Sequence, residues 1–292
     1  MRKALLYWLF IVCLPWFGCT QEKMYSHVDS LGIDPVSYAD YHNKWFNLAD
    51  GLDYIEMDAP RKSILNDSKI SILKVNPNKV DFQMLSASQN DSMPLTADCW
   101  AETYDLNVVI NAGMYDLRRK LSSKGFLQNG DYCNNPELYP GYNAMIAFNP
   151  NDTLKNNFKV LDLKCDDWNN VKGDFQCYAQ GLRMIDCNGA ALSWNKPQSC
   201  SMLVVSTDAL GNIYYIFTRS PYTHNQMITF MRGFPFKLTN AIYMEGGPQT
   251  SLFIQVGDRT IAKVGSYVSQ TFPNDDNMEF WPLPNVIGVK LR

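Results

Sequence analysis

The chain has 292 residues, with 26 lysines and arginines against 29 acidic residues and a formal net charge of −3. No basic stripe or domain-wide positive charge is present, which argues against a nucleic acid as partner. The length fits one or two domains, but no Pro-, Gly- or Ser-rich linker, repeat or low-complexity segment divides residues 45–292. We therefore expect one domain over residues 45–292.

The first 18 residues have the pattern of a secretory signal peptide. Arg2 and Lys3 precede roughly ten apolar residues, a stretch too short for a comfortable membrane span. Gly18 before Cys19 fits the processing site of a bacterial lipoprotein, although the aromatic pair before Gly18 departs from the usual box. Cys19 would then be the lipidated first residue. The pattern favours a lipoprotein over plain secretion, and an uncleaved anchor is the least favoured alternative.

Cleavage after residue 18 would remove two basic residues and no acidic ones, leaving 24 basic and 29 acidic residues and a charge of −5. Residues 19–44 are polar and irregular, as expected of a tether or loosely docked lead-in. No later segment is long and apolar enough to cross a bilayer. We expect an exported protein at the cell envelope, in contact with the membrane only through an N-terminal lipid, or otherwise periplasmic or secreted.

Six cysteines follow the signal region: Cys99, Cys133, Cys165, Cys177, Cys187 and Cys200. An even number in an exported chain permits disulfides, but six cysteines allow fifteen connectivities. Cys165–Cys177 and Cys187–Cys200 are plausible local bridges. No C-x-x-C motif occurs and the three histidines are scattered, which argues against a Cys/His zinc site. We expect no cofactor, and the sequence leaves open a structural Ca²⁺ ion and the oligomeric state.

Over most of the chain, short apolar runs separated by turn residues are typical of β-structure. The expected strands are Ile70–Val75, Val80–Leu85, Asn107–Asn111, Ala144–Phe148, Met202–Ser206 and Ile213–Phe217. Residues 76–78, Asn-Pro-Asn, have turn chemistry between the first two strands, and Asp208–Asn212 predicts a hairpin between the last two.

Two helices are expected among these strands. One spans Thr96–Tyr104, with Thr96 as its N-cap. The other spans His224–Arg232, where Met227, Phe230 and Met231 share one face. Strands outnumber helices, and the helices fall between them. This order favours an α+β single domain with a mixed, twisted β-sheet core and flanking helices.

One segment combines a strand with chemistry. Glu245 directly follows the apolar run Ala241–Met244. Gly246 and Gly247 come next, and the sequence Pro-Gln-Thr-Ser follows them. Glycines permit backbone conformations that other residues avoid and let backbone N–H groups approach a ligand. A carboxylate at such a strand end is well placed for catalysis or sugar binding, although Gly-Gly also makes ordinary hairpins.

Four segments, in order and at similar spacing, resemble elements of the phosphodiester glycosidase family. They are Val109–Tyr115, Lys124–Gly130, Ala179–Ile185 and Glu245–Ser251, and the resemblance covers about residues 45–292. The first is similar to the family's Asn-Gly-Gly-Phe-Phe element after a strand, and the last to its Asp-Gly-Gly-Gly-Ser-Ser element. The best-known member removes N-acetylglucosamine from the phosphodiester that masks mannose 6-phosphate on lysosomal enzymes. The resemblance therefore implies a hydrolase.

Two departures from the family pattern bear on activity. Glu245 stands where the family has Asp, which moves the carboxylate by more than about 1 Å if the backbone is retained, a shift that can be costly in catalysis. The arginine that usually follows the Gln-Gly element is not evident. Either the substrate is altered or activity has been lost, and the resemblance is a better guide to the fold than to the reaction.

The resemblance and the chemistry together give a candidate site. Cleavage at the anomeric carbon passes through an oxocarbenium-like state, for which glycosidases use two carboxyl groups, and cationic donors stabilise the departing phosphate. Glu245 is the candidate base or nucleophile, and Asp116 the second carboxylate. Arg183 is the candidate phosphate ligand, because the N–H donors of a planar guanidinium match the geometry of oxyanions. The reserves are Asp186 as a carboxylate and Lys124 and Arg219 as cations.

The other substrate-binding candidates lie in the same segments: Asn111, Gly113, Tyr115, Gln180, Gly181, Gly246, Gly247, Thr250 and Ser251. Asn111 and Gln180 would hydrogen-bond sugar hydroxyls, and Tyr115 would stack on a sugar ring. Each candidate has a structural alternative: Asn111 could cap a turn, the glycines could serve only the backbone, and Arg183 could point into solvent. His224 could act as an acid or base, or simply begin a helix.

These observations lead to one main functional hypothesis and two alternatives. The main hypothesis is an exported hydrolase that cleaves a glycosyl phosphodiester, or a related envelope or host glycoconjugate. The alternative from another class is a non-catalytic carbohydrate-binding or envelope-interaction protein with the same fold. A metal-dependent phosphodiesterase acting on the P–O bond ranks last, because the chain lacks clustered His and Asp ligands.

Overall fold

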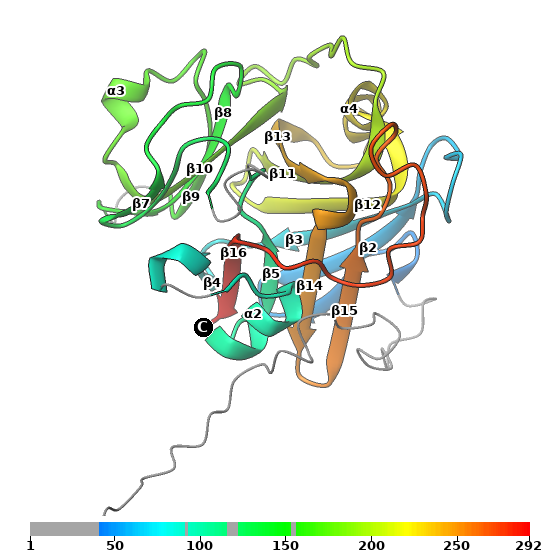
Figure 1. Cartoon of the computed structure of the whole chain (residues 1–292), viewed down its shortest axis with the longest axis horizontal. Coiled ribbons are helices and arrows are strands. Elements are labelled where there is room, and N and C mark those ends of the chain that lie inside the picture. Colours follow the sequence, from blue (N-terminus) through cyan, green and yellow to red (C-terminus); the bar gives the residue numbers. More distant parts are fainter. Residues whose placement is uncertain (1–40, 91–92, 116–121, 153–155) are drawn as a thin grey trace, which may run out of the picture.

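The protein is built from two antiparallel β-sheets, as a computed structural model of the chain shows (Figure 1). The structure describes residues 41–90, 93–115, 122–152 and 156–292. The expected signal peptide, the lipidation site Cys19 and the candidate carboxylate Asp116 lie outside these residues. Within the described residues, no helix is long and apolar enough to cross a membrane.

The larger sheet has eleven strands, in the order β1-β2-β3-β12-β11-β13-β10-β6-β7, and β8 pairs with both β10 and β9. Their bounds are β1 Phe46–Ala49, β2 Leu52–Asp58, β3 Lys69–Val75, β6 Leu127–Asn129, β7 Tyr132–Asn135, β8 Ala144–Pro150, β9 Phe158–Asp162, β10 Phe175–Ile185, β11 Ser199–Asp208, β12 Ile213–Thr223 and β13 Leu238–Gly246. Strand β13 is therefore in the interior of the sheet, between β11 and β10.

The smaller sheet has five strands, in the order β15-β14-β5-β16-β4. Their bounds are β4 Val80–Ser86, β5 Val108–Asn111, β14 Ser251–Val256, β15 Arg259–Val264 and β16 Asn285–Leu291. Strand β5 pairs with β14 and with the late strand β16, so residues far apart in sequence meet here. β15 is an edge strand.

The main core combines side chains from both sheets. Leu73 and Tyr215 of the larger sheet belong to the same buried cluster as Ile110, Ile254 and Ile287 of the smaller sheet, each with 0–1 % of its surface exposed. Full burial of a side chain of this kind contributes about 1.5–3 kcal/mol relative to leaving it exposed. Strands of the larger sheet also have a second buried face, so both faces carry apolar residues.

The helices among the described residues cover these outer faces and are short. They are α2 Ala97–Tyr104, α3 Trp168–Val171 and α4 His224–Arg232, with the 3₁₀ turns η3 Ala87–Asn90 and η4 Gly247–Gln249. Helix α4 packs Met227 and Met231 against the second face of the larger sheet. It begins with a capping box, in which Thr223 and Gln226 satisfy each other's backbone N–H groups. Helix α2 packs Trp100 against the smaller sheet.

The expected strands and both expected helices are confirmed, but the expected mixed sheet is wrong. Every pairing between named strands is antiparallel in the described residues, and the protein is mostly β. Residues 76–78 form the expected turn, yet β3 and β4 do not pair, because the turn carries the chain from one sheet to the other. Thr96 precedes α2, but its side chain makes no capping hydrogen bond.

The expected local disulfides are also wrong. Cys165 bonds to Cys187, with a Cα–Cα distance of 6.6 Å. Cys177 and Cys200 are free and buried. Cys177 lies in the core between the sheets, whereas Cys200 lies in the cluster on the other face of the larger sheet. Burial within these strands keeps both sulfurs away from the loops that carry Cys165 and Cys187.

Candidate active site

The Glu-Gly-Gly segment carries the chain from the larger sheet to the smaller one. Glu245 and Gly246 end β13, residues 247–249 form η4, and β14 begins at Ser251 (Figure 1). The pairing of β13 with β11 shifts register between Leu203 and Val204, directly beside Glu245. Irregularities of this kind re-aim a side chain next to a functional site. The Glu245 side chain thus lies where the two sheets meet, with 9 % of its surface exposed.

Packing explains both glycines of this segment. A Cβ atom on Gly246 would collide with the Tyr243 hydroxyl. Gly247 has φ +75°, a conformation that favours glycine, and a Cβ there would collide with Val268. The two glycines allow the chain to turn tightly beside Glu245, which supports their structural alternative.

Asn111 fixes the crossover from the side of the smaller sheet. It ends β5 and is almost completely buried. Its side-chain amide donates to the Gln249 carbonyl at 2.7 Å, and its Oδ1 accepts the Ser251 N–H at 2.8 Å. Both polar atoms of Asn111 are therefore engaged inside the protein. We assign it a positioning role in place of the expected contact with sugar.

Gln180 organises a loop on the other side of the site. Its Oε1 accepts the N–H groups of Phe126 and Tyr139, each at 2.9 Å. Its Nε2 donates to the carbonyls of Tyr142 at 2.7 Å and Tyr139 at 3.3 Å. With four hydrogen bonds to backbone, Gln180 has no capacity for a sugar hydroxyl. It holds in place the loop that carries Tyr139 and Tyr142.

The carboxyl group of Glu245 lies among aromatic and apolar groups. Its Oε1 accepts one hydrogen bond, from the Gly246 N–H at 2.9 Å. Burial raises the pKa of Glu245 to about 8, against smaller opposing effects of that N–H and of the Lys124 charge. Burial, followed by the charge of Glu245, in turn raises the pKa of Tyr115 and Tyr142. Glu245 is therefore mostly protonated at neutral pH in the free protein.

Lys124 is the cation that acts on Glu245. Its ammonium lies 5.0 Å from the centre of the Tyr139 ring, a cation–π arrangement. The Tyr139 and Tyr142 rings are 4.6 Å apart, and the charge of Glu245 acts on Tyr142 as well. A backbone bridge between Tyr115 and Ser123 sets the position of this segment. The site can thus supply a proton, a positive charge and phenol groups.

Comparison with known proteins identifies the family. The model of the family described as phosphodiester glycosidase matches residues 104–290, which include all of the residues just described. The chain belongs to the phosphodiester glycosidase family. No curated protein gave a match to the chain.

Two solved structures share the fold at 12 % sequence identity. The catalytic domain of zebrafish N-acetylglucosamine-1-phosphodiester alpha-N-acetylglucosaminidase, auto-inhibited by its pro-peptide, aligns with a TM-score of 0.53 over 82 % of this chain and 84 % of its own. A hypothetical protein from Synechocystis aligns with a TM-score of 0.57 over 85 % of this chain. The present chain spans 64 % of that protein.

Arg183 does not join the candidate site of this member of the phosphodiester glycosidase family. Its Nη1 contacts both carboxylate oxygens of Asp162, at 2.7 and 2.8 Å. The same carboxylate accepts the Cys187 N–H, next to the Cys165–Cys187 disulfide. Both contacts come from one guanidinium nitrogen, and the carboxylate charge neutralises the guanidinium. The expected phosphate role of Arg183 is therefore replaced by a structural ion pair.

The remaining candidates divide between the site and its surroundings. Tyr115 hydrogen-bonds to the Gln249 side chain and is electrostatically coupled to Glu245. Asp186 accepts N–H groups of its own turn, from Asn188 and Ala190. Arg219 pairs with Asp275 and is not among the groups that act on the Glu245 carboxyl. The other four candidates have local structural roles. Gly113 adopts φ +99°, and Gly181 packs against the Tyr243 carbonyl. Thr250 is fully buried, and the Ser251 hydroxyl donates to the Gln249 carbonyl.

His224 begins α4, as its structural alternative proposed. Its ring stacks on Trp194 at 3.8 Å and meets the Tyr243 ring edge-on at 4.7 Å. Neither ring nitrogen has a hydrogen-bond partner in the described part of the chain. Burial, followed by the charge of Lys196, lowers the pKa of His224 to about 4. The imidazole is neutral at physiological pH and supports the far side of Tyr243.

Sequence reasoning missed Tyr139 and Tyr142 and ranked Lys124 too low. The two tyrosines belong to a loop without a motif, so only the hydrogen bonds of Gln180 bring them to the site. Gly125 offered a usable signal: a Cβ atom there would press on the Gln180 side chain. A glycine next to Lys124 thus marks close packing of this loop against β10.

Proposed function

We propose that this protein is an exported hydrolase that cleaves a glycosyl phosphodiester between the sugar carbon and the bridging oxygen. The observation that supports it most is the carboxyl group of Glu245, buried at the junction of the sheets with a raised pKa and with Lys124 as its neighbouring cation. Perturbed carboxyl groups of this kind cluster at functional sites. Family membership supports the same reaction class.

The raised pKa changes the role assigned to Glu245. At neutral pH a carboxyl group with a pKa of about 8 is mostly protonated, so it suits a general acid better than a base or nucleophile. A protonated carboxyl also avoids the repulsion that a carboxylate would exert on a phosphodiester anion. Lys124 would add an attractive charge beside the phosphate.

The proposed reaction needs one carboxyl group in two protonation states. Glu245 donates its proton to the phosphate oxygen as the bond between the anomeric carbon and that oxygen breaks, and the phosphate monoester departs with the bonding electrons. Water then adds to the oxocarbenium-like carbon and returns a proton to the Glu245 carboxylate. The products are the free sugar and a phosphate monoester, and the enzyme regains its proton.

A test with isotopic water distinguishes this reaction from phosphodiesterase action. The purified protein is incubated with a methyl phosphodiester of N-acetylglucosamine 1-phosphate in H₂¹⁸O. Cleavage at the sugar carbon places ¹⁸O in the released sugar, and this is the expected result. Cleavage at phosphorus places ¹⁸O in the phosphate product and would reject the proposal in favour of the P–O alternative.

The residue assignment is tested on the same substrate. Glu245→Gln keeps the shape of the side chain but removes the proton donor, so turnover should fall by about 10²–10⁴-fold. Glu137→Gln makes the same change at an exposed position and is the matched control. Circular dichroism establishes that both variants fold. Unchanged turnover in Glu245→Gln would end the assignment.

The binding-protein alternative also has an observation in its favour. Asn111, Gln180 and Arg183 are all engaged by internal partners. Among the described residues, Glu245 is the one carboxyl in the junction just described, where most glycosidases use two. Calorimetric binding of the sugar without turnover on any phosphodiester would favour this alternative, and turnover would exclude it.

We propose export with lipid attachment at Cys19 as the setting of this reaction. The basic and apolar N-terminus and the Gly-Cys pair support it. The Cys165–Cys187 disulfide supports an oxidising compartment, where such bonds form and persist. In a bacterial host, Cys19→Ala should abolish radiolabelled palmitate incorporation and release the protein from the membrane fraction. Retained label would refute lipidation at Cys19.

A further inference from the structure

A crevice lies between the sheets, at the edge formed by β15. It has a volume of about 300 Å³, at the small end of the range for ligand sites. The larger sheet contributes Glu56, Ser71 and Arg219, and the smaller sheet contributes Lys263. None of these four residues is among the groups that act on the Glu245 carboxyl. The crevice is therefore separate in composition from the candidate active site.

A buried ion pair forms one wall of the crevice. The Lys263 ammonium lies 2.5 Å from Oε2 of Glu56, which also accepts hydrogen bonds from Ser71 at 3.0 Å and Tyr54 at 3.3 Å. All three bonds use the same oxygen. In the described structure Oε1 of Glu56 has no hydrogen-bond partner, although the side chain lines the crevice. One carboxylate oxygen is thus open to a donor.

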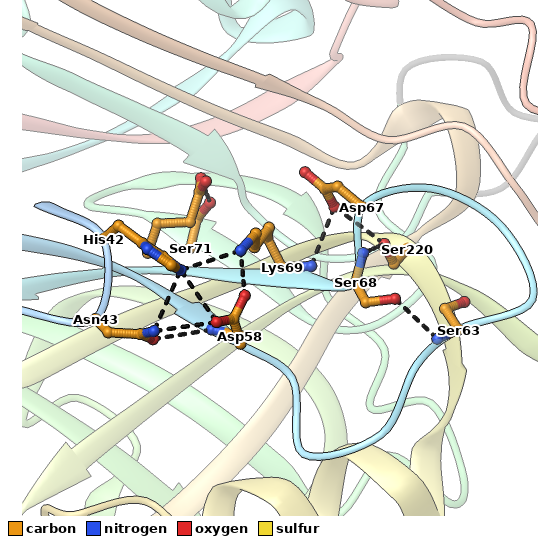
Figure 2. A network of polar contacts seen from close by, with 10 residues as sticks. His42, Asn43, Asp58, Ser63, Asp67, Ser68, Lys69, Ser71 and Ser220 are labelled. Carbon is orange, nitrogen blue, oxygen red and sulfur yellow. Dashed lines mark hydrogen bonds and ion pairs between the residues drawn. The ribbon is translucent and has the colours of Figure 1, made fainter. Parts of the chain in front are cut away.

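The cations around the crevice already have anionic partners. Lys69 is paired with Asp58 and also contacts His42, as Figure 2 shows. Arg219 lies 2.9 Å from Asp275 and donates to the Val264 carbonyl. Lys263 is paired with Glu56. Without a surplus of positive charge, the crevice is poorly suited to a phosphate or carboxylate ligand.

Other groups at the crevice suit a neutral ligand with many hydroxyls. Asn66 lies at the rim with an exposed side chain that makes no hydrogen bond in the described structure. Asp67 uses Oδ1 for the Lys69 N–H and Ser220, which leaves Oδ2 as an acceptor (Figure 2). Ala262 and the exposed side chain of Met278 add apolar surface. A sugar ring has this combination of hydroxyls around an apolar face.

We propose that the crevice binds a neutral pyranose unit, as a second sugar site outside the candidate active site. The occupied cations exclude an anion, the open acceptors and the Asn66 amide match hydroxyl groups, and the volume fits one ring. Such a site would retain a glycan chain on the protein whether or not the Glu245 site hydrolyses it.

Amide chemical shifts of the ¹⁵N-labelled protein test the proposal. N-acetylglucosamine is the neutral probe, and glucuronate is a probe of the same ring size with a negative charge. N-acetylglucosamine should shift the amides of Ser71, Arg219 and Lys263 in a saturable way, and glucuronate should bind at least about fivefold more weakly. The absence of these shifts, or tighter binding of glucuronate, would overturn the proposal.

Two glycine substitutions, each at a residue with positive φ, provide a variant of the crevice and its matched control. Asn66→Gly removes the rim amide at φ +66°, a conformation that glycine adopts readily. It should weaken N-acetylglucosamine binding roughly three- to tenfold, as expected for one lost hydrogen bond. Gln270→Gly makes the same change at φ +76° on an exposed residue elsewhere and should bind like the unmodified protein. Equal affinities of both variants would overturn the assigned contact.

The same titration in Glu245→Gln separates this proposal from the hydrolase proposal. Binding at the crevice should be unchanged in that variant, even though turnover is lost. Loss of the Ser71 and Lys263 shifts in Glu245→Gln would show that these amides respond to sugar bound at the Glu245 site. That result would overturn the proposed sugar site in the crevice. Failure of turnover alone would leave the crevice result standing.

Discussion

The two glutamates that are buried among the described residues have opposite electrostatic surroundings. Glu56 and Glu245 have 4 % and 9 % of their surface exposed, so burial hardly distinguishes them. Burial would raise the pKa of Glu56, but Lys263 and three hydrogen bonds outweigh it and lower that pKa. The Glu245 carboxyl accepts one hydrogen bond, from a backbone N–H, and its lysine is more distant than the Lys263 partner of Glu56. Burial therefore dominates and raises the pKa of Glu245 to about 8.

These surroundings determine which of the two buried carboxyls is available for proton transfer. A carboxylate with an ion-pair partner is held in one charge state, and its contribution is structural. A carboxyl without such a partner can exchange its proton near neutral pH, as acid–base catalysis requires. The cost is stability, because the folded protein must bury a charge when Glu245 ionises.

The largest expected effect is a gain of stability on neutralising Glu245. Because its pKa is raised in the folded state, the folded protein holds a proton that the unfolded chain loses above about pH 4.5, so stability falls between about pH 4.5 and 8. Glu245→Gln removes this loss and should stabilise the protein by up to about 4 kcal/mol at pH 8. Urea unfolding at pH 5 and pH 8 measures it. An equal effect at both pH values would contradict the raised pKa.

The matched change at the other carboxyl should have the opposite sign. Glu56→Gln removes the partner of Lys263, and Lys263→Met leaves Glu56 as an uncompensated buried charge. Breaking a buried pair in this way should cost about 3 kcal/mol at pH 7. In Lys263→Met the deficit should shrink as the pH falls, because Glu56 becomes protonated. A deficit that does not change between pH 7 and pH 4 would contradict the ion-pair account.

A smaller effect is expected from Lys124. Its charge lowers the pKa of Glu245, so Lys124→Met should move the alkaline limb of the pH–rate profile upward, by less than about one unit because the lysine is exposed. Lys172→Met makes the same change at an exposed lysine that is not among the groups acting on Glu245 and is the control. A downward shift in Lys124→Met would contradict the assigned interaction. The full profile should fall above pH 8 if the protonated form is active.

The smallest effect on activity is expected at Arg183. If its role is the ion pair with Asp162, Arg183→Met should lower the melting temperature but change kcat/KM on the phosphodiester less than about threefold. Turnover and thermal unfolding of the same preparation check it. A loss of 10²-fold in kcat/KM without a loss of stability would restore the phosphate role that the sequence first suggested.

Sequence alone predicted the local elements and gave Glu245 as the candidate centre of the site. Apolar runs and turn residues placed the strands and helix α4, and Gly246 and Gly247 drew attention to Glu245. The division into two sheets escaped prediction, because a turn such as residues 76–78 looks the same whether it joins paired strands or carries the chain between sheets.

The contents of the site were harder to predict, because they depend on partners distant in sequence. From sequence, Gln180 is a candidate sugar ligand, but in the structure its side-chain amide is hydrogen-bonded to the backbone of Phe126 and Tyr142. Arg183 reads as a phosphate ligand until Asp162 is found beside it. Neither partner follows from spacing along the chain, so polar residues in motifs cannot be divided into contact and positioning roles from sequence.

The most direct test of the central claim is the titration of Glu245 itself. Carbon-13 NMR of the glutamate side-chain carboxyls follows each group through pH 3–10, and the signal missing in Glu245→Gln assigns the residue. A midpoint near pH 8 is expected for Glu245. A midpoint near the ordinary glutamate value of about 4.3 would contradict the claim that this carboxyl is the protonated acid of the site.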